Sequence, residues 1–288
     1  MKILIAEHSG FCFGVKRAVN ILESLMPLEE IVYTLGPIIH NQQVTNEYSE
    51  KGVQVIESLD DIPDHSRNEG DVKVVIRSHG APKSVYDQAS TMGIKLLDAT
   101  CPYVKKIQNT VSSYASKGYN IIIVGNSQHP EVIGINGWCD NKAEIVENLE
   151  HVMQLSPSNH PTCVVAQTTF SIKLWDLMIE AIKDKIPEAT IFNTICLATE
   201  ERQKAVLDLA TKVDLMVVVG GKHSSNTIKL AELCAKQVRT IHIETKDDLN
   251  GADLIGTKVV GITAGASTPD WIIQSVILKI ENEGEVIF

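Results

Sequence analysis

The sequence has no apolar run close to the roughly 20 residues that a membrane-crossing helix needs. The apolar run Met1–Ala6 is too short for a signal peptide, and no small-residue cleavage site follows it. We therefore expect a cytoplasmic protein without a membrane partner. The hydrophobic share of 44% is nevertheless high enough for several packed cores.

The sequence also lacks an excess of positive charge. Its formal net charge is −10, whereas a basic face is the usual footprint of a nucleic-acid-binding protein. The glycines Gly10 and Gly14 do not have the spacing of the G-x-G-x-x-G pattern that binds dinucleotides. We therefore expect neither nucleic acid nor a nicotinamide cofactor as a partner.

None of the six cysteines belongs to a C-x-x-C pair, so local motif evidence for a metal site is weak. Their even number permits disulfides, but these are disfavoured in a large chain without an export signal. Cys163 lies in an apolar strand and Cys234 on a helix face, so both are best interpreted as small buried hydrophobes. Cys139 has no role that the sequence assigns.

The other three cysteines occupy a pattern that occurs three times. Cys12, Cys101 and Cys196 each follow an apolar, strand-like run and precede a stretch of helical period. They are 89 and 95 residues apart, about the length of a small α/β domain. A thiolate is favoured at the positive end of a helix. We therefore predict a threefold internal repeat with one metal-binding or reactive cysteine in each repeat.

Two polar loops recur with each cysteine, and each follows a buried apolar strand. The first loop combines a glycine 24 residues after the cysteine with a histidine, as in Gly36 and His40, Gly125 and His129, and Gly220 and His223. The second loop comprises Arg77–Gly80, Gln167–Thr169 or Ala264–Pro269. Because ligands bind at the carboxyl ends of strands in open α/β sheets, we expect these loops to line the site.

Apolar strands alternate with amphipathic helices along the whole chain, which is typical of βαβ units and parallel sheets. We therefore predict an α/β fold of three similar small domains, comprising residues 14–100, 101–195 and 196–282. Helices are expected near residues 14–27, 41–52, 83–92, 102–117, 130–138, 171–185, 199–212, 225–236 and 270–282.

Three cysteines from three repeats can bind one metal centre. A structural zinc site normally has four protein ligands, and no fourth is obvious here. The donor set suits an iron–sulfur cluster with one open iron, or a zinc ion with an open position. Three thiols with unrelated roles are a further alternative that the residues leave open.

The polar loops have the composition of an anion pocket. Helix N-termini after these loops add backbone donors and a favourable dipole for a phosphate or diphosphate. Each polar residue could instead be a helix cap or a structural histidine. The candidates are His40, His79, His129, Ser224, Ser225, Asn226, Thr227 and Ser267.

Glu131 follows Pro130 at a predicted helix start, so it could be a surface glutamate that compensates the helix dipole. Its place beside His129 also makes it a candidate proton donor. General acid catalysis requires a carboxyl within hydrogen-bond reach of the substrate and a raised pKa. Thr168 could relay that proton.

Together these motifs resemble those of the 4-hydroxy-3-methylbut-2-enyl diphosphate reductases, the LytB family, from Met1 to about Ile280. Each motif is modest alone, but their combination is specific. The matching stretches are Gly10–Val15, His40–Asn41, Arg77–Gly80, Asp98–Pro102, His129–Glu131, Gln167–Thr169, Ser224–Asn226 and Thr263–Ser267.

The resemblance implies a pseudo-threefold trefoil of three α/β domains around a central 4Fe–4S cluster, with residues 1–13 packing on the third domain. Cys12, Cys101 and Cys196 would ligate three irons, and the fourth iron would be open to substrate. The reaction would be two-electron reductive dehydroxylation of (E)-4-hydroxy-3-methylbut-2-enyl diphosphate, the last step of the non-mevalonate isoprenoid pathway. The products would be isopentenyl and dimethylallyl diphosphate, and the electron donor a ferredoxin or flavodoxin.

Carried over position by position, the resemblance also implies residue roles. Glu131 would supply protons, Thr168 would position the substrate hydroxyl and His129 would line the same pocket. The residues that bind the diphosphate substrate would be His40, His79, His129, Thr168, Thr169, Ser224, Ser225, Asn226 and Ser267.

Two other functions are compatible with three cysteines around a cluster. A quinolinate synthase-like enzyme also resembles a three-domain protein with a three-cysteine cluster, but it condenses and dehydrates rather than reduces. A non-enzymatic iron–sulfur sensor or electron carrier would leave Glu131 and Thr168 without a purpose. The acidic net charge weighs further against a DNA-binding sensor.

Overall fold

The computed structural model describes residues 1–26, 31–63, 72–156 and 160–286. The strands of these residues form three four-stranded sheets, with orders β3-β2-β4-β5, β7-β6-β8-β9 and β1-β12-β10-β11. Every strand pair in them is parallel. The predicted α/β class, with similar small parallel sheets and flanking helices, is confirmed.

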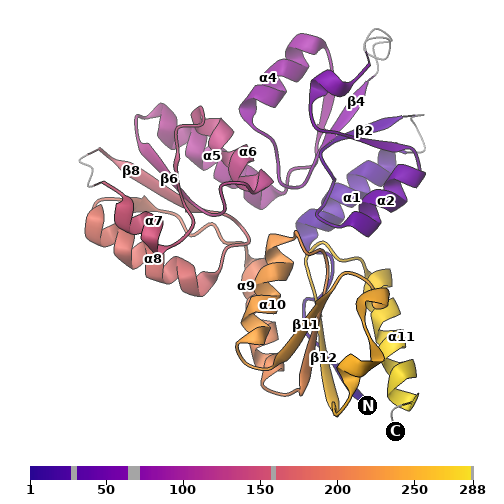
Figure 1. Ribbon diagram of the computed structural model, residues 1–288. Helices are drawn as coiled ribbons and strands as arrows, with labels where there is room; N and C mark the ends of the chain where they lie inside the picture. The colour runs from indigo at the N-terminus through magenta and orange to yellow at the C-terminus, as the bar shows by residue number, and fades with distance from the viewer. Residues whose placement is uncertain (27–30, 64–71, 157–159, 287–288) are drawn as a thin grey trace. The chain divides into compact units, whose positions relative to one another are not determined.

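The first sheet has two helices on one side and one on the other (Figure 1). Its strands are β2 (Val32–Leu35), β3 (Val53–Ile56), β4 (Lys73–Ile76) and β5 (Lys95–Asp98). The helices around it are α1 (Phe13–Leu25), α2 (Gln42–Glu50) and α4 (Lys83–Met92).

The second sheet lies between the pair α5 and α6 and the pair α7 and α8 (Figure 1). Its strands are β6 (Asn120–Val124), β7 (Glu144–Val146), β8 (Thr162–Ala166) and β9 (Thr190–Ile191). Its helices are α5 (Pro102–Ser116), α6 (Pro130–Asn136), α7 (Leu149–Gln154) and α8 (Ile172–Lys185).

The third sheet takes its fourth strand from the beginning of the chain. Its strands are β10 (Leu215–Val219), β11 (Arg239–Ile243), β12 (Val259–Ala264) and β1 (Lys2–Ile5). Helices α9 (Leu197–Ala210) and α10 (Ser225–Ala235) lie on one side of it and α11 (Asp270–Val286) on the other (Figure 1). Because β1 pairs with β12, Cys12 follows the fourth strand of a sheet, as Cys101 follows β5 and Cys196 follows β9.

The chain divides into two compact units. Unit one contains the third sheet and comprises Met1–Val15, His40–Val44 and Leu197–Phe288. Unit two contains the first two sheets and comprises Lys16–Ile39 and Thr45–Cys196. The division into three domains at residues 14–100, 101–195 and 196–282 stays a prediction.

The sheets are buried on both faces, which explains why their central strands are apolar without alternation. On one face of the second sheet, Val124 and Val164 belong to a buried cluster with Trp175 of α8. On its other face, Ile123 belongs to a cluster with Val111 of α5. Successive strand residues therefore serve opposite faces of one sheet.

Each predicted helix is present, but α7 and the edge strands β3, β7 and β11 were not predicted. The missed strands occupy the same position in all three sheets, at the edge beside the first strand of the repeat. Helix α11 extends to Val286, beyond the predicted end at residue 282. Residue 27, the predicted end of the first helix, lies outside the described residues.

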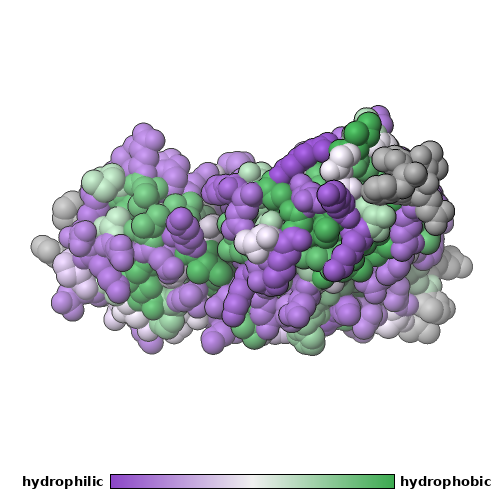
Figure 2. Space-filling model, turned by 90° about the horizontal axis from the view of Figure 1, so that it is seen from below, coloured by the Kyte–Doolittle hydropathy of each residue, from purple (hydrophilic) through white to green (hydrophobic). Residues whose placement is uncertain are grey.

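No helix in the described ranges is long and apolar enough to cross a membrane. On the face drawn in Figure 2, hydrophobic residues form groups that hydrophilic residues separate. Exposed large hydrophobic side chains occur in both units, among them Phe13, Met153 and Trp271.

Candidate functional site

In all three repeats, the backbone N–H of the cysteine donates to a carbonyl of the second polar loop. The bonds run from Cys12 N to Ala266 O (3.1 Å), from Cys101 N to Ser78 O (2.9 Å) and from Cys196 N to Thr168 O (3.1 Å). Each predicted ligand cysteine therefore lies beside a loop with predicted substrate-binding residues. Those residues are Ser267 in unit one, and His79 and Thr168 in unit two.

The recurring glycine has a steric cause that is also repeated. A Cβ at Gly36 would lie 2.5 Å from Arg77, one at Gly125 would lie 2.8 Å from Gln167, and one at Gly220 would lie 2.5 Å from Thr268. In each repeat the glycine of the first polar loop therefore lies against a side chain of the second, which would have to shift if the glycine carried a Cβ. The sequence spacing had identified the glycines but not their contact partners.

The three predicted ligand cysteines differ from the other three in burial and position. All six are thiols. Cys12, Cys101 and Cys196 are partly exposed and directly precede α1, α5 and α9. The other three are buried, and burial raises the pKa of the thiols of Cys163 and Cys234 to about 12. Because only a thiolate is a good metal ligand, the partly exposed set fits an iron–sulfur cluster and the buried set does not.

Glu131 is a buried carboxyl, only 2% exposed, rather than a surface glutamate. The backbone N–H of Thr168 donates to Glu131 Oε1 at 2.6 Å, and Thr168 Oγ1 donates to Oε2 at 2.7 Å. Burial raises the pKa of this carboxyl to about 7, although the hydrogen bonds from Thr168 favour the ionised form. The interpretation as an exposed, dipole-compensating residue is therefore wrong, and one requirement of a proton donor, a raised pKa, is met.

Two histidines lie in the same unit as this carboxyl. His129 caps α6, and its Nδ1 accepts the backbone N–H of Glu131 at 3.2 Å. The rings of His79 and His129 meet edge to face, with centroids 5.5 Å apart. Thr169 Oγ1 accepts a hydrogen bond from Gln167 Nε2 at 2.9 Å. Unit two thus combines the candidates for proton transfer with two imidazoles.

Gln167 is a contact residue whose role the sequence did not indicate. Its Nε2 donates to Thr169, and its Oε1 accepts the backbone N–H of Asn126 at 3.1 Å. The residue is only 1% exposed. It therefore joins the two polar loops of the second repeat. The motif Gln167–Thr169 contained it, but no pattern distinguishes a bridging glutamine from a surface one.

Unit one brings together the serine, asparagine and His40 candidates. Ser267 Oγ donates to His40 O at 3.0 Å, which joins two segments 227 residues apart. Ser224 caps α10, where its hydroxyl accepts the backbone N–H of Thr227 at 3.4 Å. Asn226 is 5% exposed, and its Nδ2 has no hydrogen-bond partner among the described residues. A buried amide donor in this state is costly unless a guest satisfies it.

His223, the histidine of the third repeat, does not share this environment. It is exposed, whereas Ser224 and Asn226 beside it are buried. The spacing from the cysteine therefore identified the equivalent loop in the third repeat, but His223 is not equivalent to His40 and His129 in its surroundings.

The LytB protein family matches residues 3–281. The chain belongs to the LytB family. LytB proteins depend on an iron–sulfur centre. Family membership therefore favours an iron–sulfur cluster over a zinc ion or three thiols with unrelated roles.

Two named relatives are similar over nearly their whole length. The 4-hydroxy-3-methylbut-2-enyl diphosphate reductase of Caldanaerobacter subterraneus subsp. tengcongensis is 50% identical over 285 residues, covering 98% of this chain and 97% of the relative. The reductase of Clostridioides difficile is 46% identical over 284 residues, covering 98% and 100%. These names favour a reductase over a quinolinate synthase-like enzyme or a sensor.

Solved LytB structures share the fold. The E-1-hydroxy-2-methyl-but-2-enyl-4-diphosphate reductase from Plasmodium falciparum has a TM-score of 0.91 and 31% identity, covering 98% of this chain and 88% of that one. A second structure is described as the terminal enzyme of the non-mevalonate pathway. It has a TM-score of 0.70 and 40% identity, covering 98% and 99%.

The raised pKa of Glu131 predicts a pH dependence of stability. The folded chain retains a proton on this carboxyl up to about pH 7, whereas the carboxyl ordinarily releases it near 4.5. The folded state therefore binds more protons between these values, and the free energy of unfolding should fall by about 3 kcal/mol as pH rises through them. Glu131→Gln has no such proton and should lack this loss. Urea unfolding of both proteins at pH 4.5 and 8 measures this loss. If the unfolding free energies of wild type and variant differ by the same amount at both pH values, the pKa of Glu131 is not raised.

Proposed function

We propose that this chain catalyses the two-electron reductive dehydroxylation of (E)-4-hydroxy-3-methylbut-2-enyl diphosphate to isopentenyl and dimethylallyl diphosphate. Membership of the LytB family and the names of its relatives support this reaction. The observation that carries it is a buried carboxyl with a pKa near 7, which Thr168 joins to the backbone of Cys196. This arrangement supports the assignment of Glu131 as a proton donor close to a candidate redox ligand, as a reductive loss of water requires.

The proposed cofactor is one 4Fe–4S cluster that Cys12, Cys101 and Cys196 hold, with the fourth iron open to substrate. When bound, this cluster supplies electrons singly and a Lewis-acidic iron for the substrate hydroxyl. The partly exposed thiols at three helix N-termini support the ligand assignment. A ferredoxin or flavodoxin is the proposed electron donor, and neither nucleic acid nor a membrane is a proposed partner.

Two protons and two electrons enter for each water released. Thr168 Oγ1 is the group that we assign to the substrate hydroxyl. As the hydroxyl proton of Thr168 moves to the leaving oxygen, the protonated form of Glu131 returns a proton from Oε2, which lies 2.7 Å from Thr168 Oγ1. The second proton forms the new C–H bond at either end of the allyl group, which accounts for two products.

His129 contributes through its tautomer. Because Nδ1 accepts the N–H of Glu131, the neutral ring carries its proton on Nε2. That N–H is a donor suited to an anionic substrate group. The same hydrogen bond fixes the start of α6 and with it the position of Glu131.

We assign the diphosphate to the N-terminus of α10 and the loops around it. Backbone N–H groups there favour a multiply charged anion. The side chains proposed to bind it are Ser224, Ser225, Asn226, Ser267 and His40 in unit one, with His79, His129 and Thr169 also assigned to substrate binding. Asn226 supports this assignment, because its buried Nδ2 has no hydrogen-bond partner within the described part of the chain.

The diphosphate assignment predicts a selective effect of Asn226→Ala. A hydrogen bond to a charged group contributes about 1.5–3 kcal/mol, so KM should rise roughly 10- to 100-fold with a smaller change in kcat. The control is Asn250→Ala, which removes only the cap of the 3₁₀ helix Gly251–Leu254. Steady-state kinetics measure both. An Asn226→Ala variant with the KM of the control would remove Asn226 from the pocket.

The reaction itself is tested by anaerobic purification, iron and sulfide counting, and an assay with a one-electron reductant. We expect about four irons and four sulfides per chain and reductant-dependent consumption of the diphosphate alcohol. Dihydroxyacetone phosphate with iminoaspartate tests the quinolinate synthase alternative. Turnover of that pair, or no consumption of the diphosphate alcohol by the loaded protein, would contradict the proposed function.

A further inference from the structure

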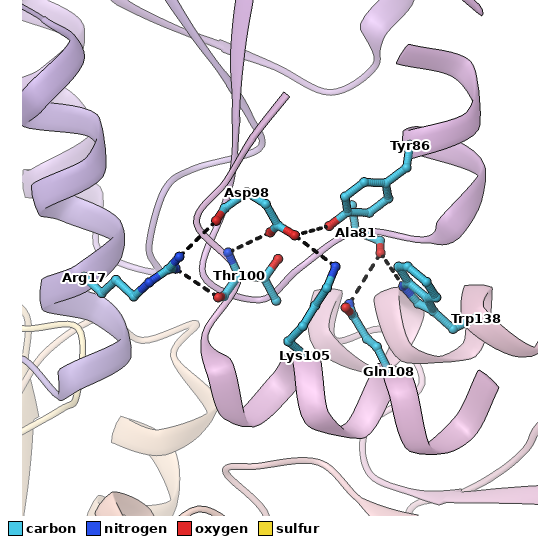
Figure 3. Close-up of polar contacts among 8 residues, drawn as sticks. All are labelled: Arg17, Ala81, Tyr86, Asp98, Thr100, Lys105, Gln108 and Trp138. Carbon is cyan, nitrogen blue, oxygen red and sulfur yellow. Dashed lines mark hydrogen bonds and ion pairs between the residues drawn. The ribbon is translucent and has the colours of Figure 1, made fainter. Parts of the chain in front are cut away.

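Arg17 reaches the turn that leads into Cys101. Its Nη1 donates to Thr100 O at 3.1 Å and its Nη2 donates to Asp98 O at 3.3 Å. Figure 3 shows the guanidinium extending from α1 to both carbonyls of this turn. A planar guanidinium holds two acceptors in a fixed geometry, which the single charge of a lysine cannot do.

The side chain of Asp98 holds the same turn from within. Its Oδ1 accepts the backbone N–H of Thr100 at 3.0 Å, while Oδ2 accepts Lys105 Nζ at 2.9 Å and Tyr86 OH at 3.2 Å. Figure 3 shows the carboxylate directed away from Arg17, toward Lys105 and Tyr86. The turn before Cys101 is therefore held by two kinds of contact. Arg17 binds its backbone carbonyls, and the carboxylate of Asp98 binds a backbone N–H of the turn.

Arg202 makes the corresponding contact before Cys12. Its Nη2 donates to Gly10 O at 2.7 Å, and the residue is only 4% exposed. A guanidinium so far removed from water is costly unless its hydrogen bonds compensate for lost hydration. Gly10 lies two residues before Cys12 and has a φ of 87°, which only glycine adopts readily.

The two arginines follow one pattern in the chain. Arg17 lies on α1, which follows Cys12, and holds the turn of Cys101. Arg202 lies on α9, which follows Cys196, and holds the turn of Cys12. In each case the helix after one cysteine supplies a charged donor to the turn of another.

We propose that Arg17 and Arg202 are positioning residues for the thiolates of Cys101 and Cys12. This inference rests on the proposed cluster. Charge-assisted hydrogen bonds to the turn carbonyls fix the backbone that presents each sulfur. Their positive charge also favours the reduced, more negative cluster, because reduction potentials depend on net charge and hydrogen bonding nearby. Outer partners of metal ligands commonly change metal affinity 10- to 100-fold.

The test compares Arg17→Met and Arg17→Lys with Lys106→Met in the anaerobically loaded protein. Lys106 is a matched control because it lies five residues after Cys101, as Arg17 lies five after Cys12, and it is exposed. Three quantities are measured: the rate of iron release to a ferrous chelator, the reduction potential, and the melting temperature of the iron-free chain. Arg202→Lys is the second variant, because removing a buried charge altogether risks misfolding.

Arg17→Met should release iron roughly 10- to 100-fold faster and have a lower reduction potential. Arg17→Lys should recover the potential but not the slow release, because it restores the charge without the two-donor geometry. Arg202→Lys should release iron faster than wild type. The inference would be overturned if Arg17→Met had the same iron-release rate and reduction potential as Lys106→Met. It would also be overturned if Arg17→Met changed only the melting temperature of the iron-free chain. Wild-type protein without a cluster would instead contradict the proposed function.

Discussion

Replacing Glu131 with glutamine is expected to lower kcat by about 10²- to 10⁴-fold with the iron content unchanged. Glutamine has the same size, and its oxygen can still accept the N–H of Thr168 that now binds Glu131 at 2.6 Å. It has no proton to return to Thr168 Oγ1, so only proton delivery is lost. Anaerobic steady-state kinetics and iron counting on the same preparation measure both quantities.

The pH profile separates this effect from damage to the fold. Because burial raises the pKa of Glu131 to about 7 in the substrate-free protein, wild-type kcat/KM should fall as pH rises above 7 and the carboxyl ionises. The variant should lack this limb. Glu150→Gln is the matched control, since Glu150 is an exposed glutamate in the first turn of α7. Normal turnover in Glu131→Gln would remove its role as the acid.

Replacing Cys101 with alanine is expected to abolish cluster binding and lower activity below detection. Cysteine thiolates anchor a 4Fe–4S cluster, and the two that remain would be too few to hold it. Cys12→Ala and Cys196→Ala should have the same result, because the cysteines are equivalent in the repeat. Iron and sulfide per chain, together with visible absorption, measure the loss.

Cys234→Ala is the control for these variants. Cys234 is fully buried in α10, and burial raises the pKa of its thiol to about 12, so it should not ligate iron. This variant should keep its iron and lose only about 1 kcal/mol of stability from the small cavity. If Cys101→Ala kept its iron, or if Cys234→Ala lost it, the ligand assignment would be wrong.

The sequence predicted the central strands and the helices because their signals are local. Runs such as Leu215–Val219 are continuous and apolar, as strands buried on both faces must be. The edge strands were missed for the converse reason. β7 has only three residues, and β3 exposes the two middle residues of its four, so neither gives a distinct pattern. Whether a short segment pairs with a sheet depends on contacts that local periodicity does not contain.

The candidate residues could be identified from spacing, but their surroundings could not. A glutamate after a proline at a helix start has the same local sequence whether it is exposed or buried. The burial of Glu131 depends on Thr168, 37 residues away. The contact of Arg202 with Gly10 spans 192 residues, and no motif indicated either arginine. Long-range hydrogen bonds of this kind require the fold itself.

Mössbauer spectroscopy of the anaerobic ⁵⁷Fe-loaded protein tests the proposed centre most directly. Three cysteine ligands and one open position predict iron sites of two kinds, three alike and one distinct. The distinct site alone should change when the diphosphate alcohol is added. Iron sites of a single kind that the substrate leaves unchanged would contradict a three-cysteine cluster with an open iron.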